Sequence, residues 1–100
     1  MSYRIIVRPD AQADMFEAGS WYDQQRTGLG TEFSEAAQLS IDSLANFPLR
    51  HTIHNQELGV RWLILRRFPY LVVYQVTGDE VIIIAVTHAA RDESAWKERL

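Results

Sequence analysis

An α+β fold is predicted for this 100-residue chain by the order in which two kinds of periodicity appear along it. Residues 10–47 repeat hydrophobic side chains at helical spacing, and a short β-rich segment precedes them. Residues 51–88 are rich in β-branched and aromatic residues, with turn signals between them. Strands that follow a pair of helices favour a mainly antiparallel sheet. We therefore expect an N-terminal strand, a helical hairpin, an antiparallel meander sheet and a short C-terminal helix.

The first two expected elements meet at a proline and an aspartate. The segment YRIIVR at 3–8 is typical of a strand, and Pro9 ends it. Asp10 can serve as a helix N-cap because its carboxylate accepts a free backbone N–H of the next turn. The helix is predicted to end near Arg26, where Gly28 can adopt the left-handed conformation. Its apolar stripe consists of Ala11, Met15, Ala18 and Tyr22.

A second helix follows the connection TGLG, so the two helices are predicted to form a hairpin. We expect this helix to end before Pro48, since a proline disfavours the helical conformation of the residue before it. Trp21 lies at the edge of the first stripe, where packing at the turn is favoured over an exposed contact with a partner. The stripe of the second helix consists of Leu29, Phe33, Ala37, Ile41 and Leu44, widened by Ala36 and Phe47.

The second half of the chain contains the predicted sheet. We expect strands at 51–54, 59–68, 70–76 and 80–88. Gly78 and Asp79 lie at the centre of a tight turn between the last two strands. Asp92 can cap a short helix over 92–100, with Glu93 favourable in its first turn.

Length and composition favour one globular domain that spans residues 1–100. Hydrophobic residues make up 47% of the chain, which argues against disorder. The apolar run at 81–86 is far shorter than the ~20 residues of a membrane helix. The N-terminal segment does not have the apolar run of a signal peptide. We therefore expect a cytoplasmic protein without a membrane role.

The formal net charge is −3, but the charges are unevenly distributed. Residues 1–46 carry three arginines against seven acids, whereas residues 47–77 carry four arginines against Glu57 alone. An acidic protein is a poor nonspecific binder of nucleic acid. The basic segment therefore indicates either a discrete anionic target or a set of solvated arginines at strand edges.

The expected sheet is too hydrophobic to have one face in water. Residues 81–86 are apolar on both faces, although a sheet with one solvated face should alternate apolar and polar residues. The helical hairpin can cover one face, whereas Trp96 and Leu100 can cover only part of the other. The remaining apolar surface predicts a protein partner, unless the short helix and the sheet twist suffice to cover it.

Four stretches form a specific combination. They are WYD at 21–23 with Leu29-Gly30 and Phe33, Arg61, RRFPYLVVYQV at 66–76, and HAARDESAW at 88–96. In this combination the chain resembles the RelE/ParE superfamily, the toxins of bacterial type II toxin–antitoxin operons. The resemblance implies a small twisted antiparallel sheet packed on a helical hairpin. It also implies an antitoxin partner that wraps its C-terminal segment over the toxin, with a homodimer and a heterotetramer with the antitoxin both open.

The resemblance leaves two mechanisms open. RelE-like members cleave messenger RNA in the ribosome, using a lysine- and arginine-rich cluster and a C-terminal tyrosine, whereas ParE-like members act on DNA gyrase. Arg61 and Arg91 fit arginine positions of the family and could clamp a phosphate. Trp96 lies near the position of the tyrosine, and an indole cannot exchange a proton. His88 could substitute, because histidine is the side-chain type that titrates near neutral pH.

We expect gyrase inhibition ahead of messenger RNA cleavage, and ahead of an inactive member that only binds an antitoxin. The FPY segment, the single lysine and the H-x-x-R ending favour the ParE-like branch, which requires no catalytic residue and no cofactor. The catalytic candidates of a nuclease are Arg61, His88 and Arg91. The candidate contacts with a target or an antitoxin are Arg61, Arg66, Arg67, Tyr70, His88, Arg91 and Trp96.

Other catalytic and metal-binding combinations are weak. His51 and His54 would point to opposite faces of a strand, and the chain has no cysteine, so we expect no metal site. His88, Asp92 and Ser94 have the residue types of a hydrolase triad. They crowd into a single seven-residue stretch without a nucleophile elbow, which argues against that chemistry.

Overall fold

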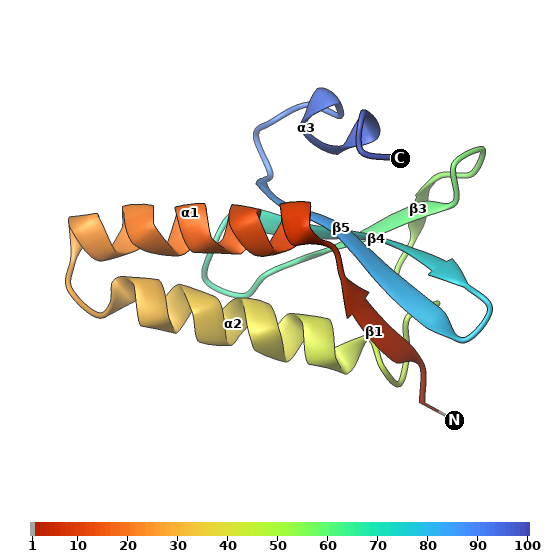
Figure 1. Ribbon diagram of the computed structural model, residues 1–100, viewed down its shortest axis with the longest axis horizontal. Coiled ribbons are helices and arrows are strands. Elements are labelled where there is room, and N and C mark those ends of the chain that lie inside the picture. The colour runs from red at the N-terminus through yellow and green to blue at the C-terminus, as the bar shows by residue number, and fades with distance from the viewer. Residues whose placement is uncertain (1) are drawn as a thin grey trace.

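The computed structural model describes residues 2–100 and contains a five-stranded sheet with a hairpin of two helices (Figure 1). The first strand and the hairpin are β1 (Arg4–Val7), α1 (Pro9–Gln25) and α2 (Leu29–Ser43). The remaining elements are β2 (Ile53–Asn55), β3 (Val60–Ile64), β4 (Tyr70–Thr77), β5 (Glu80–His88) and α3 (Ser94–Lys97). The predicted α+β fold is confirmed. Within residues 2–100, no helix is long and apolar enough to cross a membrane.

The strand order is β1-β5-β4-β3-β2, so the first and last strands of the chain are neighbours. β2 to β5 pair antiparallel as the predicted meander, whereas β1 pairs parallel with β5. Two parallel strands need a long connection between them. Here that connection includes the helical hairpin. Figure 1 shows α1 and α2 side by side, with α3 apart from them beyond the end of β5.

The start of α1 and the end of α2 differ from the prediction, whereas α1 ends at Gln25, beside the predicted Arg26. Arg8 and not Asp10 is the N-cap of α1, because Pro9 already starts the helix and Asp10 lies in its first turn. The second helix ends at Ser43 and not near Phe47, and the chain continues through turns at 44–46. Proline 48 is therefore too distant to be the residue that ends the helix.

Of the later elements, β3 and α3 are also shorter than predicted. β3 ends at Ile64 instead of continuing toward β4, because the chain turns through Arg67, whose φ is 73°. α3 is a single turn, shorter than the helix predicted over 92–100. Its N-cap is Glu93 and not the predicted Asp92. The Asp92 carboxylate nevertheless accepts the N–H of Ser94, the first residue of the turn, at 3.0 Å.

Two hydrophobic clusters lie on the two faces of the sheet. The larger cluster joins the helices to the sheet, with Phe33, Ile41, Tyr74 and Ile83 fully buried. In the smaller cluster, Trp96 of α3 is 2% exposed and packs with Val73 and Ile84 on the other face. Trp96 covers this face as predicted. Leu100 and Phe47 are 43% and 61% exposed, so neither covers the sheet as expected.

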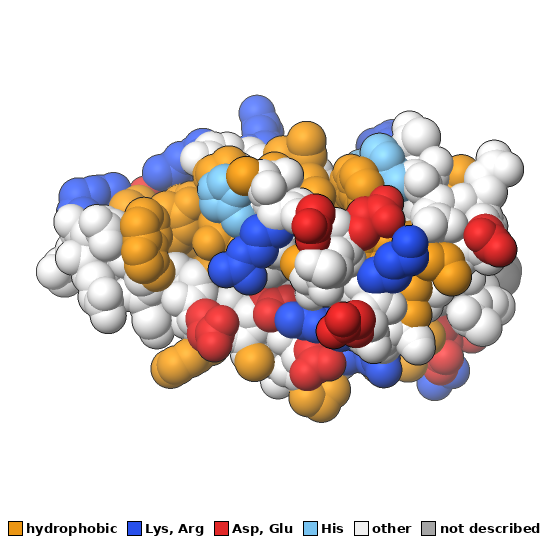
Figure 2. Space-filling model, turned by 90° about the horizontal axis from the view of Figure 1, so that it is seen from above, with side chains coloured by type: hydrophobic (Ala, Val, Ile, Leu, Met, Phe, Trp, Pro, Cys, Tyr) orange, Lys and Arg blue, Asp and Glu red, His pale blue; other side chains and the backbone are white. Residues whose placement is uncertain are grey.

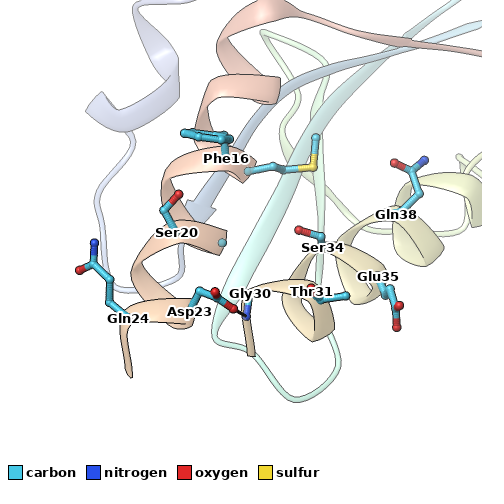
Figure 3. Close-up of a pocket in the computed structure, with 11 residues that line it drawn as sticks. Phe16, Ser20, Asp23, Gln24, Gly30, Thr31, Ser34, Glu35 and Gln38 are labelled. Atoms are coloured by element: carbon cyan, nitrogen blue, oxygen red, sulfur yellow. Dashed lines mark hydrogen bonds between the residues drawn. The ribbon is translucent and has the colours of Figure 1, made fainter. Parts of the chain in front are cut away.

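The two long helices approach each other closely at a pair of glycines. A Cβ on Gly30 would lie 2.4 Å from the carbonyl oxygen of Gly19, which is too short for any real contact. A Cβ on Gly19 would meet the Ser34 hydroxyl at 3.5 Å and the carbonyl oxygen of Gly30 at 3.7 Å, both ordinary contacts. Asp23 accepts the N–H of Gly28 at 3.0 Å. It also accepts the N–H of Gly30 at 3.1 Å (Figure 3). This carboxylate thus satisfies free N–H groups at the start of α2 from within α1.

Gly30→Ala is expected to lower the free energy of unfolding by about 1–3 kcal/mol, the usual cost of forcing a methyl group into a packed contact. The matched variant is Gly19→Ala, on the other side of the same contact. It fits without a clash and removes a glycine from a helix interior, so it should stabilise by up to about 1 kcal/mol. Urea denaturation measures both changes. Equal effects of the two substitutions would contradict the close approach.

Side chains of β3 and β4 hold the segment between α2 and β2. The hydroxyl of the buried Tyr74 donates to the carbonyl oxygen of Pro48 at 2.5 Å. Arg61 donates to the carbonyl oxygens of Leu49 and His51, at 3.5 and 2.6 Å. Burial raises the pKa of Tyr74 to about 12, because a phenolate would be poorly hydrated at this position, and the charge of Arg61 only partly opposes this.

The stability of the protein should fall as the pH rises from 10 to about 12. The phenol of Tyr74 loses its proton near pH 10 in the unfolded chain and near pH 12 in the folded one. The stabilisation is therefore fully present below pH 10 and is lost across this window, by about 2–3 kcal/mol. Tyr74→Phe should flatten this part of the profile in urea denaturation. The same slope in both proteins would rule out this role of Tyr74.

Candidate interaction site at the carboxyl end of β5

A β-bulge in β5 decides which side chains reach the candidate site. The register with β4 shifts at Ile84, which is an extra residue on the β5 side. Ile83 and Val86 therefore both pack in the helix-side cluster, although they are three residues apart. Beyond the bulge, His88 is the register partner of Tyr70, and their ring centroids lie 5.3 Å apart. The bulge thus directs His88 toward the side of the sheet that α1 covers.

A cavity of about 740 Å³ lies between α1 and this end of the sheet. Its lining includes Glu17, Trp21 and Tyr22 of α1, Tyr70 of β4, His88 of β5, and Arg91 of the following loop. The structure therefore brings together three of the predicted contact residues, which come from two neighbouring strand ends. The cavity combines aromatic walls with the guanidinium of Arg91 and the carboxylates of Asp14 and Glu17.

One ring nitrogen of His88 is already used within the chain. Its Nδ1 accepts the backbone N–H of Ala90 at 3.0 Å. A neutral imidazole has one donor and one acceptor nitrogen, so Nε2 carries the proton. His88 therefore offers a hydrogen-bond donor and not a general base. The loop after β5 is hydrogen-bonded to the β3–β4 loop, since the N–H of Ala89 donates to the carbonyl oxygen of Pro69 at 2.8 Å.

The two tyrosines of the cavity keep their protons. Burial raises the pKa of Tyr70, and the nearby charge of Arg91 only partly opposes this. Burial and the neighbouring Tyr70 also raise the pKa of Tyr22. Tyr22 packs edge-on against Phe68, with ring centroids 4.9 Å apart. These phenols therefore supply packing and hydrogen-bond donors, but no base at neutral pH.

The β3–β4 loop brings Arg66 and Arg67 to the same end of the sheet. Arg67 donates to Glu32 at 2.6 Å, and Glu32 also binds Arg26 at 3.1 Å. Hydrogen bonds from these two guanidinium groups lower the pKa of the Glu32 carboxyl. In the part of the chain that the structure describes, neither Arg66 nor Arg91 forms an ion pair. Both are exposed and therefore accessible to a partner.

Arg61 lies outside this cavity. It pairs with Tyr74, four residues along β4 from Tyr70, which is roughly 13 Å at the rise of a strand. Its guanidinium is bound to the carbonyl oxygens of the segment before β2. The structure therefore does not bring Arg61 together with Arg91, the second arginine of the predicted phosphate clamp.

Two of the three tryptophans, Trp21 and Trp96, bear on the predicted contacts. Trp96 is buried on the opposite face of the sheet, so it is remote from the other contact candidates. Trp21 is 54% exposed and lines the cavity, with its ring centroid 5.1 Å from that of Tyr22. The expectation that Trp21 packs at the helical turn is wrong, because Asp23 and the closely packed glycines close that turn. The sequence signal for the exposure of Trp21 was its position at the edge of the apolar stripe of the first helix.

A second hollow of similar volume lies between α1 and α2 (Figure 3). Its lining includes Phe16, Ser20, Asp23, Glu35 and Gln38, and no arginine, lysine or histidine. It contains none of the predicted site residues. Across residues 2–100, no group of three or more histidine, aspartate or glutamate side chains is placed to hold a metal ion.

Comparisons with known proteins agree with this architecture. Residues 5–93 match the ParE toxin family of type II toxin–antitoxin systems, parDE. No curated protein matches the chain. Among solved structures, it is similar to a chromosomal ParDE system from P. aeruginosa, with 19% identity, a TM-score of 0.66, and coverage of 87% of this chain and 96% of that one.

Two further solved structures are similar. A mutant of the E. coli toxin RelE in the free state has 20% identity and a TM-score of 0.71, with 100% of this chain and 99% of that chain covered. A chain of the toxin–antitoxin complex RelBE2 from Mycobacterium tuberculosis has 20% identity and a TM-score of 0.62, with 88% and 99% covered. At these identities, the likeness concerns the fold.

The sheet and the helical hairpin therefore give the chain the same fold as these solved structures. More narrowly, the match over residues 5–93 shows that the chain belongs to the ParE toxin family of type II toxin–antitoxin systems.

We expect the neutral form of His88 to be the Nε2–H tautomer, because Nδ1 accepts the N–H of Ala90. Long-range ¹H–¹⁵N NMR spectra of the imidazole rings distinguish the two tautomers. His54, whose ring stacks on Trp62 at 3.7 Å, serves as an internal reference. A proton on Nδ1 of His88 would contradict this hydrogen bond and would make the ring available as a base.

Proposed function

We propose that this protein inhibits DNA gyrase and is neutralised by a cognate antitoxin. Membership of the ParE toxin family and the likeness to a ParDE system support this proposal. The observation that carries it is the separation of the candidate catalytic groups. Arg61 is bound to main-chain carbonyl oxygens, away from the cavity that Arg91 lines. A protein that binds gyrase needs no such catalytic pair.

The chemistry of the cavity supports binding more than RNA cleavage. Cleavage needs a base for the 2′-hydroxyl, positive charge beside the phosphate and an acid for the leaving oxygen. His88 uses Nδ1 to accept an internal hydrogen bond, and burial keeps the proton on Tyr70. Trp96 is buried at the far face of the sheet. In the cavity, His88 and Tyr70 therefore act as hydrogen-bond donors beside one cation, and neither supplies the base.

The same cavity has residue types that dominate binding at protein interfaces. Tryptophan, tyrosine and arginine are enriched among the residues that carry most of the binding energy, and Trp21, Tyr70 and Arg91 line one hollow. In Figure 2, acidic, basic and hydrophobic side chains alternate on the face seen from above, without a continuous basic patch. This mixture suits a protein partner better than the phosphate surface of a ribosome.

We place the antitoxin on the sheet face that α3 covers only in part. Trp96 buries the centre of this face, but Ile64 of β3 is 64% exposed and Ile6 of β1 is 39% exposed. Hydrophobic side chains left exposed on both sides of a covered centre favour an extended partner segment that crosses the face. Such a segment would not touch the cavity, which lies on the other face of the sheet. Neutralisation would then work through the structure of the sheet or through a second contact of the antitoxin.

The gyrase proposal predicts that the purified protein stops supercoiling and leads to accumulation of cleaved plasmid. Arg91→Ala should weaken this inhibition by about tenfold, because arginine is enriched among the few interface residues whose truncation costs about 2 kcal/mol or more. Arg50→Ala is the matched control, since Arg50 is also exposed but stacks on Phe47 outside the cavity. It should inhibit as the unmodified protein does.

Supercoiling that continues at a large excess of the protein would refute the gyrase proposal. Cuts within codons of a translated message, detected by primer extension, would instead support a ribosome-dependent nuclease. Induced expression without growth arrest would support an inactive member that only binds an antitoxin.

A further inference from the structure

The second half of β5 has no strand beside it on the β1 side. β1 pairs with β5 as far as Ile83, whose carbonyl oxygen accepts the N–H of Arg8 at 3.1 Å. Past this point, the backbone carbonyl of Ile84 and the N–H of Val86 have no partner in a neighbouring strand on that side, within residues 2–100. Leaving such groups unpaired in a partly buried place costs about as much as a lost hydrogen bond.

Two side chains supply the missing hydrogen bonds. Asp14 of α1 accepts the N–H of Val86 at 3.0 Å, and Arg99 donates to the carbonyl oxygen of Ile84 at 3.1 Å. Asp14 and Arg99 also bind each other through two contacts of 2.6 and 2.9 Å. Their side chains are only 16% and 25% exposed. The hydrogen bond to Asp14 raises the pKa of the Arg99 guanidinium, so this group stays charged.

We propose that Asp14 and Arg99 are positioning residues that replace the missing strand, fix the bulge of β5, and so hold His88 and Arg91 at the cavity. The pair binds the chain at the bulge and just beyond it. Arg99 holds the bulged residue Ile84 itself, and Asp14 holds the strand just beyond it. This inference rests on the proposed function in one respect, because it assumes that the cavity is the contact site for gyrase.

The face that His88 occupies depends on this bulge. Side chains alternate between the two faces of a strand, so a shift of one residue moves every later side chain to the other face. Residues 81–86 are apolar throughout, so their hydrophobicity opposes such a shift only weakly. Hydrogen bonds to the backbone of Ile84 and Val86 specify the register where the side chains do not.

The attachment of α3 does not depend on the guanidinium of Arg99. Trp96 is buried in the cluster on the far face of the sheet, and Arg8 donates to the main-chain carbonyl oxygen of Arg99 at 2.7 Å. Removal of the Arg99 side chain beyond Cβ leaves both contacts possible. The positioning of β5 can therefore be tested without detaching the C-terminal helix.

Arg99→Ala is the variant for the test, because Asp14 lines the cavity and could itself contact a target, whereas Arg99 does not line it. Amide exchange at Val86 should become about tenfold faster, the effect of one hydrogen bond to a charged group. The NMR signals of the His88 ring should move, and gyrase inhibition should weaken by about tenfold. Millimolar methylguanidinium should restore all three, whereas sodium chloride at equal ionic strength should not.

Arg4→Ala is the matched control, since it removes an arginine that pairs with Glu80 at 2.6 Å at the opposite end of β5. It should change none of the three measurements. Unchanged Val86 exchange and His88 signals in Arg99→Ala would overturn the proposal. So would altered signals with full gyrase inhibition, because the pair would then not matter for target contact.

Two further outcomes are also decisive. If circular dichroism shows that Arg99→Ala is unfolded, Arg99→Lys takes its place, because it keeps the charge but cannot bind Asp14 and Ile84 together in the same geometry. Val86 exchange in Arg99→Lys then supports or overturns the proposal. If the unmodified protein does not inhibit gyrase, the proposed function fails, whereas the exchange and ring signals still decide whether the pair positions His88.

Discussion

The bulge at Ile84 is the constraint on which most of this structure depends. It allows residues on both sides of it to contribute to the helix-side core, while Ile84 itself packs against α3 on the other face. The same shift in the alternation of side chains turns His88 toward Tyr70 and the cavity. A bulge leaves backbone groups unpaired unless other groups bind them. One carboxylate from the first helix and one guanidinium from the last residues of the chain do so here.

The order of elements was predictable because helical and strand periodicities are local signals. The ends of the elements were less predictable. Pro9 starts α1 before the expected cap, and Arg67 adopts a left-handed backbone conformation that its residue type does not indicate. The bulge could not be predicted at all. Every residue in 81–86 is apolar, so no polar residue marks which face each side chain occupies. Where a sequence has no alternation, it cannot indicate a change in alternation.

The candidate site was partly predictable, because the predicted order of the strands already indicates which strand ends are neighbours. Tyr70, His88 and Arg91 flank neighbouring strand ends, and the hairpin topology brings such ends together. Arginines were harder to interpret, because sequence counts charges but does not identify their partners. Arg61, Arg67 and Arg99 bind carbonyl oxygens or carboxylates within the chain. Of the arginines predicted as contacts, this leaves Arg66 and Arg91 without such partners among residues 2–100.

The carboxylate of Asp23 has a consequence for the order of folding. It caps the start of α2 from the last turns of α1, so the two helices stabilise each other through contacts only five and seven residues apart. Such local contacts close quickly, whereas the pairing of Ile5 with Val81 must bring together distant parts of the chain. We therefore expect the hairpin to form early, as a surface on which the meander then assembles, with β1 entering the sheet only after β5 exists.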